Sequence, residues 1–333
     1  MARSRSIFRP GPALIRHLRL ATLAAGLAVA GCGGGKPAGP AALVLGDQAG
    51  LTQAKINAAG ALKDAPFAYS WASFPGASPL FEALAAGAVD TAPAGDTPVI
   101  AAAAARAPIR IVAATRSSGA GVAILVPSDS AIRTVADLRG HEVIVSSARG
   151  SVAQYLLLGA LREAGVDPAQ VTIGFMPPND AAAAFGAGRI EAWATFGIYQ
   201  ATAESRGARI VRDGRGINSG LGFLAVAQAA LDDPAKRQTI IAYVARLRRA
   251  NDWSRAHPDA YAAVYARQTG VPLSIAKVMV VRENPSLVAP DAAIARELQT
   301  VADRFHREGV LPASVDVAPL VDATIFAAAA KQP

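Results

Sequence analysis

After residue 40, short apolar and β-branched runs alternate with helical stretches. The strand-like runs are Ala41–Gly46, Phe67–Phe74, Ile109–Thr115, Val122–Pro127, Glu142–Ser147 and Val171–Pro178. Helical patterns such as Pro79–Gly87 and Ser151–Gly165 lie between them. Strands that alternate with helices predict βαβ units, mainly parallel sheets, and ligand binding at the carboxyl ends of the strands.

From about Asp232 onward the pattern becomes helical. Ile240, Tyr243, Val244 and Leu247 recur at helical spacing, which predicts helices that pack against a core. The stretch 236–251 is basic but has no interleaved aromatic residues. We therefore interpret it as a solvated helix face and expect no nucleic-acid partner.

The N-terminus has the order of an export signal. A basic segment ending at Arg19 precedes 11 small or apolar residues, 20–30, too few to cross the roughly 30 Å of a bilayer core. Val29-Ala30-Gly31-Cys32 follows and resembles a bacterial lipobox, in which the cysteine receives a lipid. We predict a lipoprotein signal peptide at 1–31, lipidation of Cys32 and a flexible tether at 32–40. The alternative is that Cys32 is only a small buried residue.

The net charge of +8 reflects mainly this leader. The first 31 residues contain five arginines and no acid, which leaves 28 bases against 25 acids in the remainder. The low charge content, 17%, and 52% hydrophobic residues predict a folded core and argue against disorder. The length favours about two domains.

Catalytic and metal-binding patterns are missing from the sequence. The four histidines are scattered, with no second ligand type at metal spacing, and no Walker A loop, G-x-S-x-G or H-E-x-x-H motif is present. We therefore expect no metal, no cofactor and no enzymatic activity.

Small, hydroxyl-rich or glycine-rich turns recur where a strand passes into a helix. They contain Gln48, Gly76 with Ser78, Asp96 with Thr97, and Gly150 with Ser151. Helix starts offer unpaired N–H groups that favour an anion, and the carboxyl ends of strands converge on one crevice. Ordinary N-capping by the same side chains is the alternative at each loop.

Three larger side chains are further candidates. Arg149 stands beside the Gly150–Ser151 turn and could take an anionic head group in a bidentate hydrogen bond, or it could simply be solvated. Trp193 and Phe196 could form the wall of an apolar slot, or could belong to the core.

At these residues the chain resembles the substrate-binding subunits of ABC importers for aliphatic sulfonates, a group that also serves nitrate, taurine and thiamine-precursor uptake. The likeness runs through nearly the whole mature chain. It is carried by Phe74-Pro75-Gly76, Gly95-Asp96-Thr97-Pro98, Ala123–Pro127, Val135–Gly140, Gly150-Ser151, Tyr155–Leu158, Pro177-Pro178 and Ala192-Trp193.

The resemblance implies a two-lobed type II periplasmic binding fold of the α/β class, with a mixed sheet and flanking helices in each lobe and helices at the C-terminus. One lobe would comprise 41–127 and 217–333, and the other 128–216. The family places its anionic head group against the loops of Gln48, Gly76–Ser78, Asp96–Thr97 and Gly150–Ser151. Two departures, Asp47 beside the glutamine and Phe196-Gly197-Ile198 after the tryptophan, favour a bulkier or less acidic ligand than a short alkanesulfonate.

The resemblance thus implies a monomeric, lipid-anchored periplasmic receptor that delivers a small organosulfonate to an ABC permease and its ATPase. Nitrate, taurine or a thiamine-precursor pyrimidine are alternative ligands. A biosynthetic enzyme of the same fold, or a sensory lipoprotein without a permease, are alternative functions.

Overall fold

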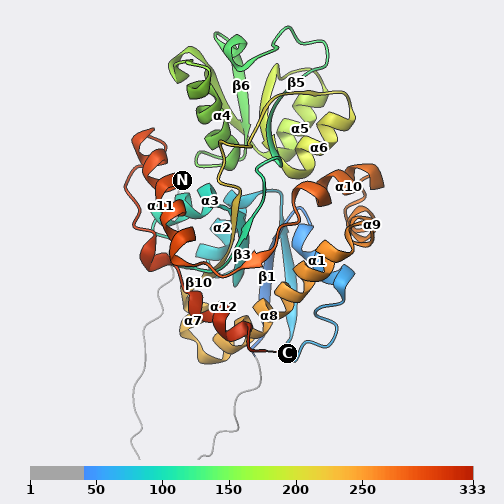
Figure 1. Cartoon of the computed structure of the whole chain (residues 1–333), viewed down its shortest axis with the longest axis vertical. Helices are drawn as coiled ribbons and strands as arrows, with labels where there is room; N and C mark the ends of the chain where they lie inside the picture. The colour runs from blue at the N-terminus through green and yellow to red at the C-terminus, as the bar shows by residue number, and fades with distance from the viewer. Residues whose placement is uncertain (1–40, 333) are drawn as a thin grey trace, which may run out of the picture. The chain divides into compact units, whose positions relative to one another are not determined.

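The strands of the chain pair into two mixed sheets in a computed structural model that describes residues 41–332 (Figure 1). The predicted signal peptide, Cys32 and the tether lie outside the described residues. The first sheet has the order β11-β4-β10-β3-β1-β2 and the second β7-β6-β8-β5-β9. The prediction of two mixed sheets with flanking helices is confirmed.

The first sheet joins parallel and antiparallel strands. Parallel pairing links β1 to β2 and β3, whereas β10 runs antiparallel to β3 and β4. Its strands are β1 (Leu43–Gln48), β2 (Tyr69–Phe74), β3 (Thr91–Gly95), β4 (Ile109–Arg116), β10 (Leu221–Ala227) and β11 (Leu287–Val288).

The second sheet repeats this arrangement. Parallel pairing links β6 to β7 and β8, and β5 runs antiparallel to β8 and β9. Its strands are β5 (Val122–Val126), β6 (Glu142–Ser146), β7 (Thr172–Met176), β8 (Ala192–Phe196) and β9 (Arg209–Asp213).

Strand β5 corrects the expected lobe boundary. The family resemblance implied that residues up to 127 belong to the first lobe, but β5 hydrogen-bonds to β8 and β9 in the second sheet. The chain therefore crosses over before Val122, and the apolar pattern of β5 could not reveal which sheet buries it. The return crossover, 214–220, contains the expected second boundary at 216.

Glycines allow the two crossovers to lie against each other. Gly119 and Gly220 both have positive φ, and a Cβ on either would lie within 2.8 Å of a backbone oxygen of the facing crossover. Ser117 N–H donates to the Gly220 carbonyl at 2.7 Å. This close backbone contact requires residues without a side chain.

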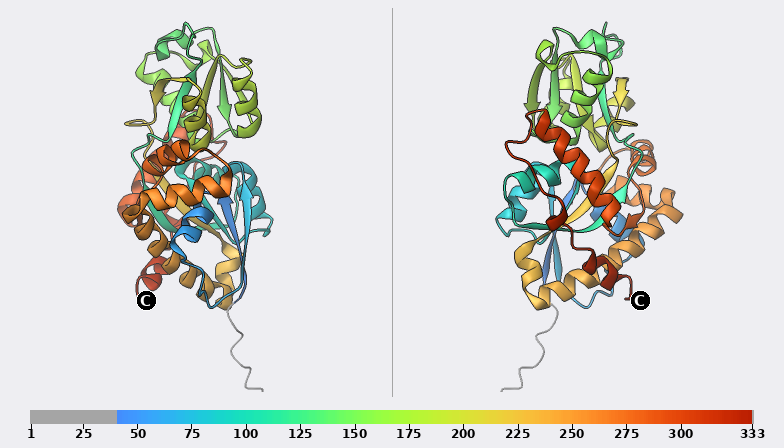
Figure 2. Two further views of the ribbon diagram at one scale, coloured as in Figure 1. Left: turned by 90° about the vertical axis from the view of Figure 1, so that its right-hand side faces the viewer. Right: turned by 60° about the vertical axis from the view of Figure 1, so that its left-hand side comes forward.

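Helices cover both faces of each sheet (Figures 1 and 2). They are α1 (Leu51–Ala59), α2 (Ala77–Ala85), α3 (Asp96–Ala104), α4 (Val152–Glu163), α5 (Pro178–Gly186), α6 (Gly197–Ser205), α7 (Gln228–Asp232), α8 (Pro234–Ala256), α9 (Pro258–Thr269), α10 (Leu273–Arg282), α11 (Ala292–Arg307) and α12 (Ala323–Ala329). Short 3-10 turns are η1 (Val135–Leu138), η2 (Pro168–Gln170) and η3 (Ala318–Leu320).

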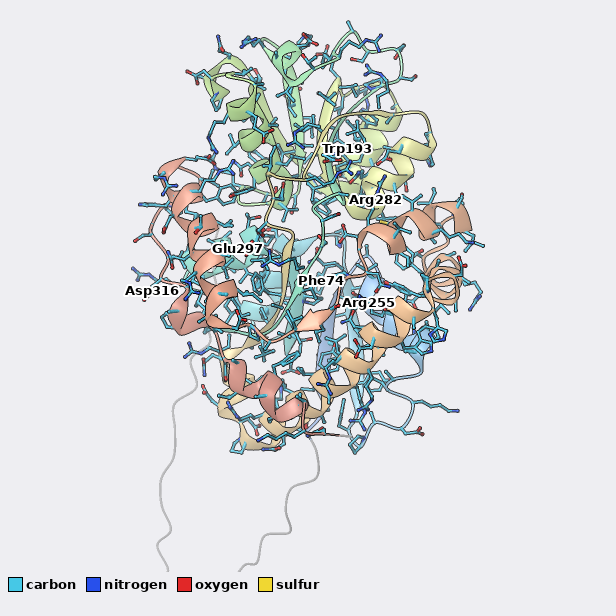
Figure 3. All side chains as sticks on the ribbon, viewed as in Figure 1. Phe74, Trp193, Arg255, Arg282, Glu297 and Asp316 are labelled. Carbon is cyan, nitrogen blue, oxygen red and sulfur yellow. The ribbon has the colours of Figure 1, made fainter. Side chains whose placement is uncertain are left out.

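The C-terminal region is helical, as predicted, apart from the two residues of β11. One of its helices, α10, packs on α6, the helix that follows β8 of the second sheet. There Arg282 forms a bidentate ion pair with Glu204 at 2.8 and 2.9 Å (Figure 3). In the basic helix α8, Lys236 pairs with Asp90 and Arg237 with Asp322. Two of its charges are thus neutralised within the chain. No helix in the described part of the chain is both long and apolar enough to cross a membrane.

Candidate functional site

A cavity of about 700 Å³ lies where the strand-to-helix loops of the two sheets meet. Its wall includes Gln48 and Asp96 from the first sheet and Arg149 and Phe196 from the second. This volume is in the range of small-molecule sites, about 300 to 1,000 Å³. Loops from the ends of strands in both sheets thus line one cavity.

The cavity gathers most of the candidate residues. Those that line it are Gln48, Ser78, Asp96, Arg149, Gly150, Ser151 and Phe196. Gly76 lies at its edge, where a Cβ would be 3.6 Å from Ser147 Oγ. Thr97 is fully buried in the first turn of α3, outside the cavity wall, and its hydroxyl has no hydrogen-bond partner in the described chain. Trp193 is also outside.

The expectation that Trp193 walls the ligand site is wrong, because of strand alternation. On β8, residues Ala192 and Ala194 face α4, while Trp193 is 1% exposed among apolar side chains of α5 and α6 (Figure 3). Its indole Nε1–H donates to Ser146 Oγ at 2.8 Å. Since successive side chains point to opposite faces, Phe196 at the strand end reaches the cavity and Trp193 does not.

Two of the loops carry carboxylates that accept N–H groups in the first turn of their own helices. Asp47 is fully buried and accepts the backbone N–H of Thr52 at 2.9 Å and of Gln53 at 3.2 Å, at the start of α1. Asp96 accepts the N–H of Thr97 at 2.7 Å and the hydroxyl of Ser219. Carboxylates therefore already accept two N–H groups at the start of α1 and one at the start of α3.

Burial raises the pKa of both carboxyls, and that of Asp96 to about 6. Hydrogen bonds from the helix N–H groups oppose this rise. Gln48 is also engaged, since its amide donates to the Pro93 carbonyl at 2.6 Å. An anionic ligand at either of these two helix starts would lie beside a carboxyl group that already accepts helix N–H groups.

Helix α4 is capped too. Ser151 Oγ accepts the N–H of Gln154 at 3.3 Å, and the Gln154 side chain accepts the N–H of Gly150 at 2.7 Å. These two bonds differ from a capping box only in that Gln154 accepts the N–H of the residue before the N-cap. The N–H of Gly150, expected to hold the ligand, is already bound.

The start of α2 differs from these three. Within the described chain no side chain caps it: Gly76 precedes the helix, and Ala77 and Ser78 line the cavity. The Ser147 hydroxyl of the second sheet lies next to Gly76, and Arg149 lines the same cavity without an ion pair to any carboxylate in residues 41–332. Its guanidinium lies 5.9 Å from the centre of the Phe175 ring. N–H groups and a hydroxyl thus lie together at the start of α2, and a cation lines the same cavity.

Sequence reasoning missed Ser147, Lys55 and Glu283 of this site and considered Tyr199 only as an aromatic side chain. Ser147 directly follows β6 with φ of 74°, a left-handed conformation that no sequence pattern indicated. The hydroxyl of Tyr199 on α6 lies 3.1 Å from the Pro75 carbonyl before α2, and burial raises its pKa to about 12. Lys55 of α1 and Glu283, which follows α10, also line the cavity. The only sequence feature that could have indicated Lys55 and Glu283 is a single charged residue among the apolar residues of a helical pattern.

A metal role has no support in the geometry of residues 41–332: no three His, Cys, Asp or Glu side chains there are grouped closely enough to hold an ion. What the cavity offers is hydrogen-bond donors, apolar surface and a few charges.

The family model described as NMT1/THI5 like matches residues 75–260, more than half of the chain. The match spans the starts of α2, α3 and α4. The chain belongs to this family. It is homologous to an aliphatic sulfonates-binding protein of Escherichia coli (strain K12), with 33% identity over 251 residues, 74% of this chain and 77% of the relative. The resemblance drawn from the sequence is confirmed.

Solved structures of the same fold support the family assignment. The alkanesulfonate-binding protein SsuA from Xanthomonas axonopodis pv. citri, bound to MOPS, has a TM-score of 0.79 and 30% identity, and covers 86% of this chain and 99% of its own. The desulfurization enzyme DSZB has a TM-score of 0.64 at 17% identity, over 87% of this chain and 98% of its own, which is a likeness of fold alone. The family member thus has a periplasmic binding protein fold, and its homologues are binding proteins.

Proposed function

We propose that this protein is the solute-binding component of an ABC importer and that it binds a small organosulfonate in the cavity between its two sheets. The observation that carries the proposal is the uncapped start of α2, which faces the Ser147 hydroxyl and shares the cavity with Arg149. The sulfonate-binding homologues support the same ligand class.

The chemistry of a sulfonate suits this position. The sulfonate group stays ionised at all physiological pH values, and its three oxygens share one negative charge. These oxygens accept hydrogen bonds and donate none. The first turn of α2 supplies N–H donors and the positive end of the helix dipole. Arg149 adds a guanidinium that can bind two oxygens at once, and Ser147 adds a hydroxyl donor. Phe196 lies beside this position: its Cζ would be 3.9 Å from a Cβ placed on Gly76. The Phe196 ring offers apolar surface to the tail of the ligand.

The protein would bind and release its ligand unchanged. The two hydroxyls near the anion position, Ser147 and Tyr199, have no histidine or cysteine beside them in the cavity wall to act as a base. Burial raises the pKa of Tyr199 and so keeps it protonated. A donor-lined cavity without an activated nucleophile favours binding over reaction.

We further propose that residues 1–31 direct export, that Cys32 carries a lipid and that the mature chain faces the periplasm as a monomer. Its partners would be a permease and an ATPase. The sequence features given above support this part. Palmitate labelling of a Cys32→Ser variant tests the anchor: labelling at the wild-type level would contradict it.

A ligand screen tests the binding function. Alkanesulfonates from one to eight carbons, arylsulfonates, taurine, nitrate and a thiamine-precursor pyrimidine are compared by thermal shift and then by titration calorimetry. A sulfonate at 100 times its Kd should stabilise the folded state by about 2.7 kcal/mol. Stabilisation by nitrate or the pyrimidine but by no sulfonate would contradict the proposal. Recovery of the sulfonate unaltered, followed by NMR, tests the absence of a reaction.

A further inference from the structure

Glu283, the residue after α10, differs from the other acids of the cavity wall. Asp47 and Asp96 accept helix N–H groups, and Glu82 accepts the Ser78 hydroxyl at 3.3 Å. Glu283 also lines the cavity, yet its carboxyl has no hydrogen bond and no ion pair within 4 Å to another residue in 41–332. Among the acids of the cavity wall, Glu283 is therefore the one whose carboxyl oxygens are available to a ligand.

The carboxyl of Glu283 lies in a space kept open by a glycine. A Cβ on Gly121, in the first crossover, would lie 1.5 Å from Glu283 Oε1. The carboxyl is therefore pressed against backbone on one side and faces the cavity on another. Burial raises its pKa from 4.5 to about 7. An unpaired carboxylate in such surroundings is costly to ionise unless a donor reaches it.

The nearest buried cation is already held. Lys55 on α1 is 7% exposed, and its Nζ donates to Asn251 Oδ1 at 2.6 Å. Its charge attracts Glu283 from beyond ion-pair distance, and burial lowers its pKa to about 8. Arg282, next to Glu283 in the chain, is bound to Glu204 instead. Neither cation completes the hydrogen bonding of the Glu283 carboxyl.

We propose that Glu283 is a subsite for a protonated amine on the tail of the ligand, so that the preferred ligands are aminoalkanesulfonates. This inference rests on the proposed function, which supplies the sulfonate position at α2, Ser147 and Arg149. A ligand with an anionic head and a cationic tail places each charge beside its complement. The ammonium donates to the Glu283 carboxylate, and the ion pair forms in a partly buried cavity where it is weakly screened.

The pH dependence follows from every charged group around Glu283. Lys55 on α1 and Arg282 on α10 act on it, and Tyr261 and Tyr265 on α9, whose pKa values burial raises, also interact with its charge. As the pH rises from 6 to 8, Glu283 loses its proton and Lys55 begins to lose its own. Both changes make the subsite more negative, so the preference for an amine increases with pH.

Calorimetry on the full chain tests the subsite with matched ligand pairs. The probes are 2-aminoethane-, 3-aminopropane- and 4-aminobutanesulfonate, each compared with the alkanesulfonate in which a methyl group replaces the ammonium. At pH 8 we expect at least one amine to bind about tenfold more tightly than its partner, the size of one charge-assisted hydrogen bond. Glu283→Gln should reduce this ratio to about one. Glu82→Gln, which removes another carboxyl of the cavity wall, should leave it unchanged.

The outcomes separate this inference from the proposed function. Binding of alkanesulfonates with no preference for an amine at any length, or a preference that survives in Glu283→Gln, would overturn the subsite while the sulfonate function stands. Failure of every sulfonate to bind would overturn both. If Glu283→Gln does not fold, the wild-type affinity ratio at pH 6 and pH 8 decides: it must rise with pH, and a constant ratio contradicts the proposal.

Discussion

The two halves of the cavity are built alike but carry different chemistry. In each sheet the parallel strand next to an edge strand is followed by a residue with positive φ, Ala49 after β1 at 50° and Ser147 after β6 at 74°. A loop then opens a helix beside the cavity, α1 in the first sheet and α4 in the second. The backbone solution is the same because both sheets must turn a buried strand into a helix within a few residues.

The side chains at these turns differ. The first half contains buried charge, with Asp47, Asp96, Lys55 and Glu283 in the wall. The second half contributes hydroxyls and the exposed Arg149. In the first half carboxylates already occupy helix starts, so the anion is expected where α2 meets the second half. Helix starts with similar backbone geometry thus differ in function. Where a nearby side chain accepts the helix N–H groups the start is capped, and where none does the N–H groups are free to bind a ligand.

The largest expected effect distinguishes the two arginines of the cavity wall. Arg149→Gln should weaken sulfonate binding by about 10- to 100-fold, because a charge-assisted hydrogen bond is worth about 1.5 to 3 kcal/mol. Arg106→Gln, which removes the arginine that follows α3 in the first half, should change the Kd by less than about twofold. Calorimetry measures both, and equal losses in the two variants would remove the special role of the second half.

The two aromatic residues of β8 provide the next comparison. Trp193→Phe deletes the indole hydrogen bond to Ser146 and part of a packed side chain, so it should lower the free energy of unfolding by about 2 kcal/mol and leave the Kd unchanged. Phe196→Ala should weaken binding by about five- to tenfold through lost apolar contact, with a smaller effect on stability. Urea unfolding and calorimetry together test this, and a large affinity loss in Trp193→Phe would place the indole in the site after all.

Asp96→Asn tests the buried charge of the first half. Because the pKa of Asp96 is raised to about 6, the folded chain keeps a proton that the unfolded chain has lost between about pH 4 and 6. The wild-type free energy of unfolding therefore falls as the pH rises through this window. The variant, which does not titrate there, should gain about 1 to 3 kcal/mol relative to wild type from pH 4.5 to 7.5.

Asp137→Asn is the control for that pH experiment. The exposed Asp137 accepts the N–H groups of Arg133 and Thr134, and these bonds lower its pKa. Its ionised form stabilises the fold, so this variant should lose stability relative to wild type as the pH rises. A change of the same sign in both variants would contradict the assigned pKa directions.

The smallest effect concerns the two strained turns. Ala49→Gly and Ser147→Gly should each raise the free energy of unfolding by about 0.5 kcal/mol, since relief of the left-handed strain slightly exceeds the added entropy of the unfolded chain. Only Ser147→Gly should also weaken sulfonate binding, through the lost hydroxyl. Thermal unfolding and calorimetry check both, and equal affinities would mean that Ser147 shapes the loop without binding.

The strand-to-helix loops were predictable because their signal is local. Gly95-Asp96-Thr97-Pro98 combines a small residue, a capping acid and a first-turn proline, and α3 begins at Asp96. The placement of Trp193 was not predictable, because one residue of strand register decides which face buries it. Glu283 and Lys55 were missed because 228 residues separate them and no short pattern links two helices.

The sequence by itself determined the fold class, the family and the position of the crevice at the ends of strands, because periodicity and helix starts depend on neighbouring residues. Only the tertiary structure decided which N–H groups remain open, since Asp47, Asp96 and Gln154 bind some of them and none caps α2. It also decided that β5 belongs to the second sheet and that the Glu283 carboxyl is left without a partner in the described chain. These facts depend on contacts between residues distant in sequence, and the burial of each group follows from those contacts.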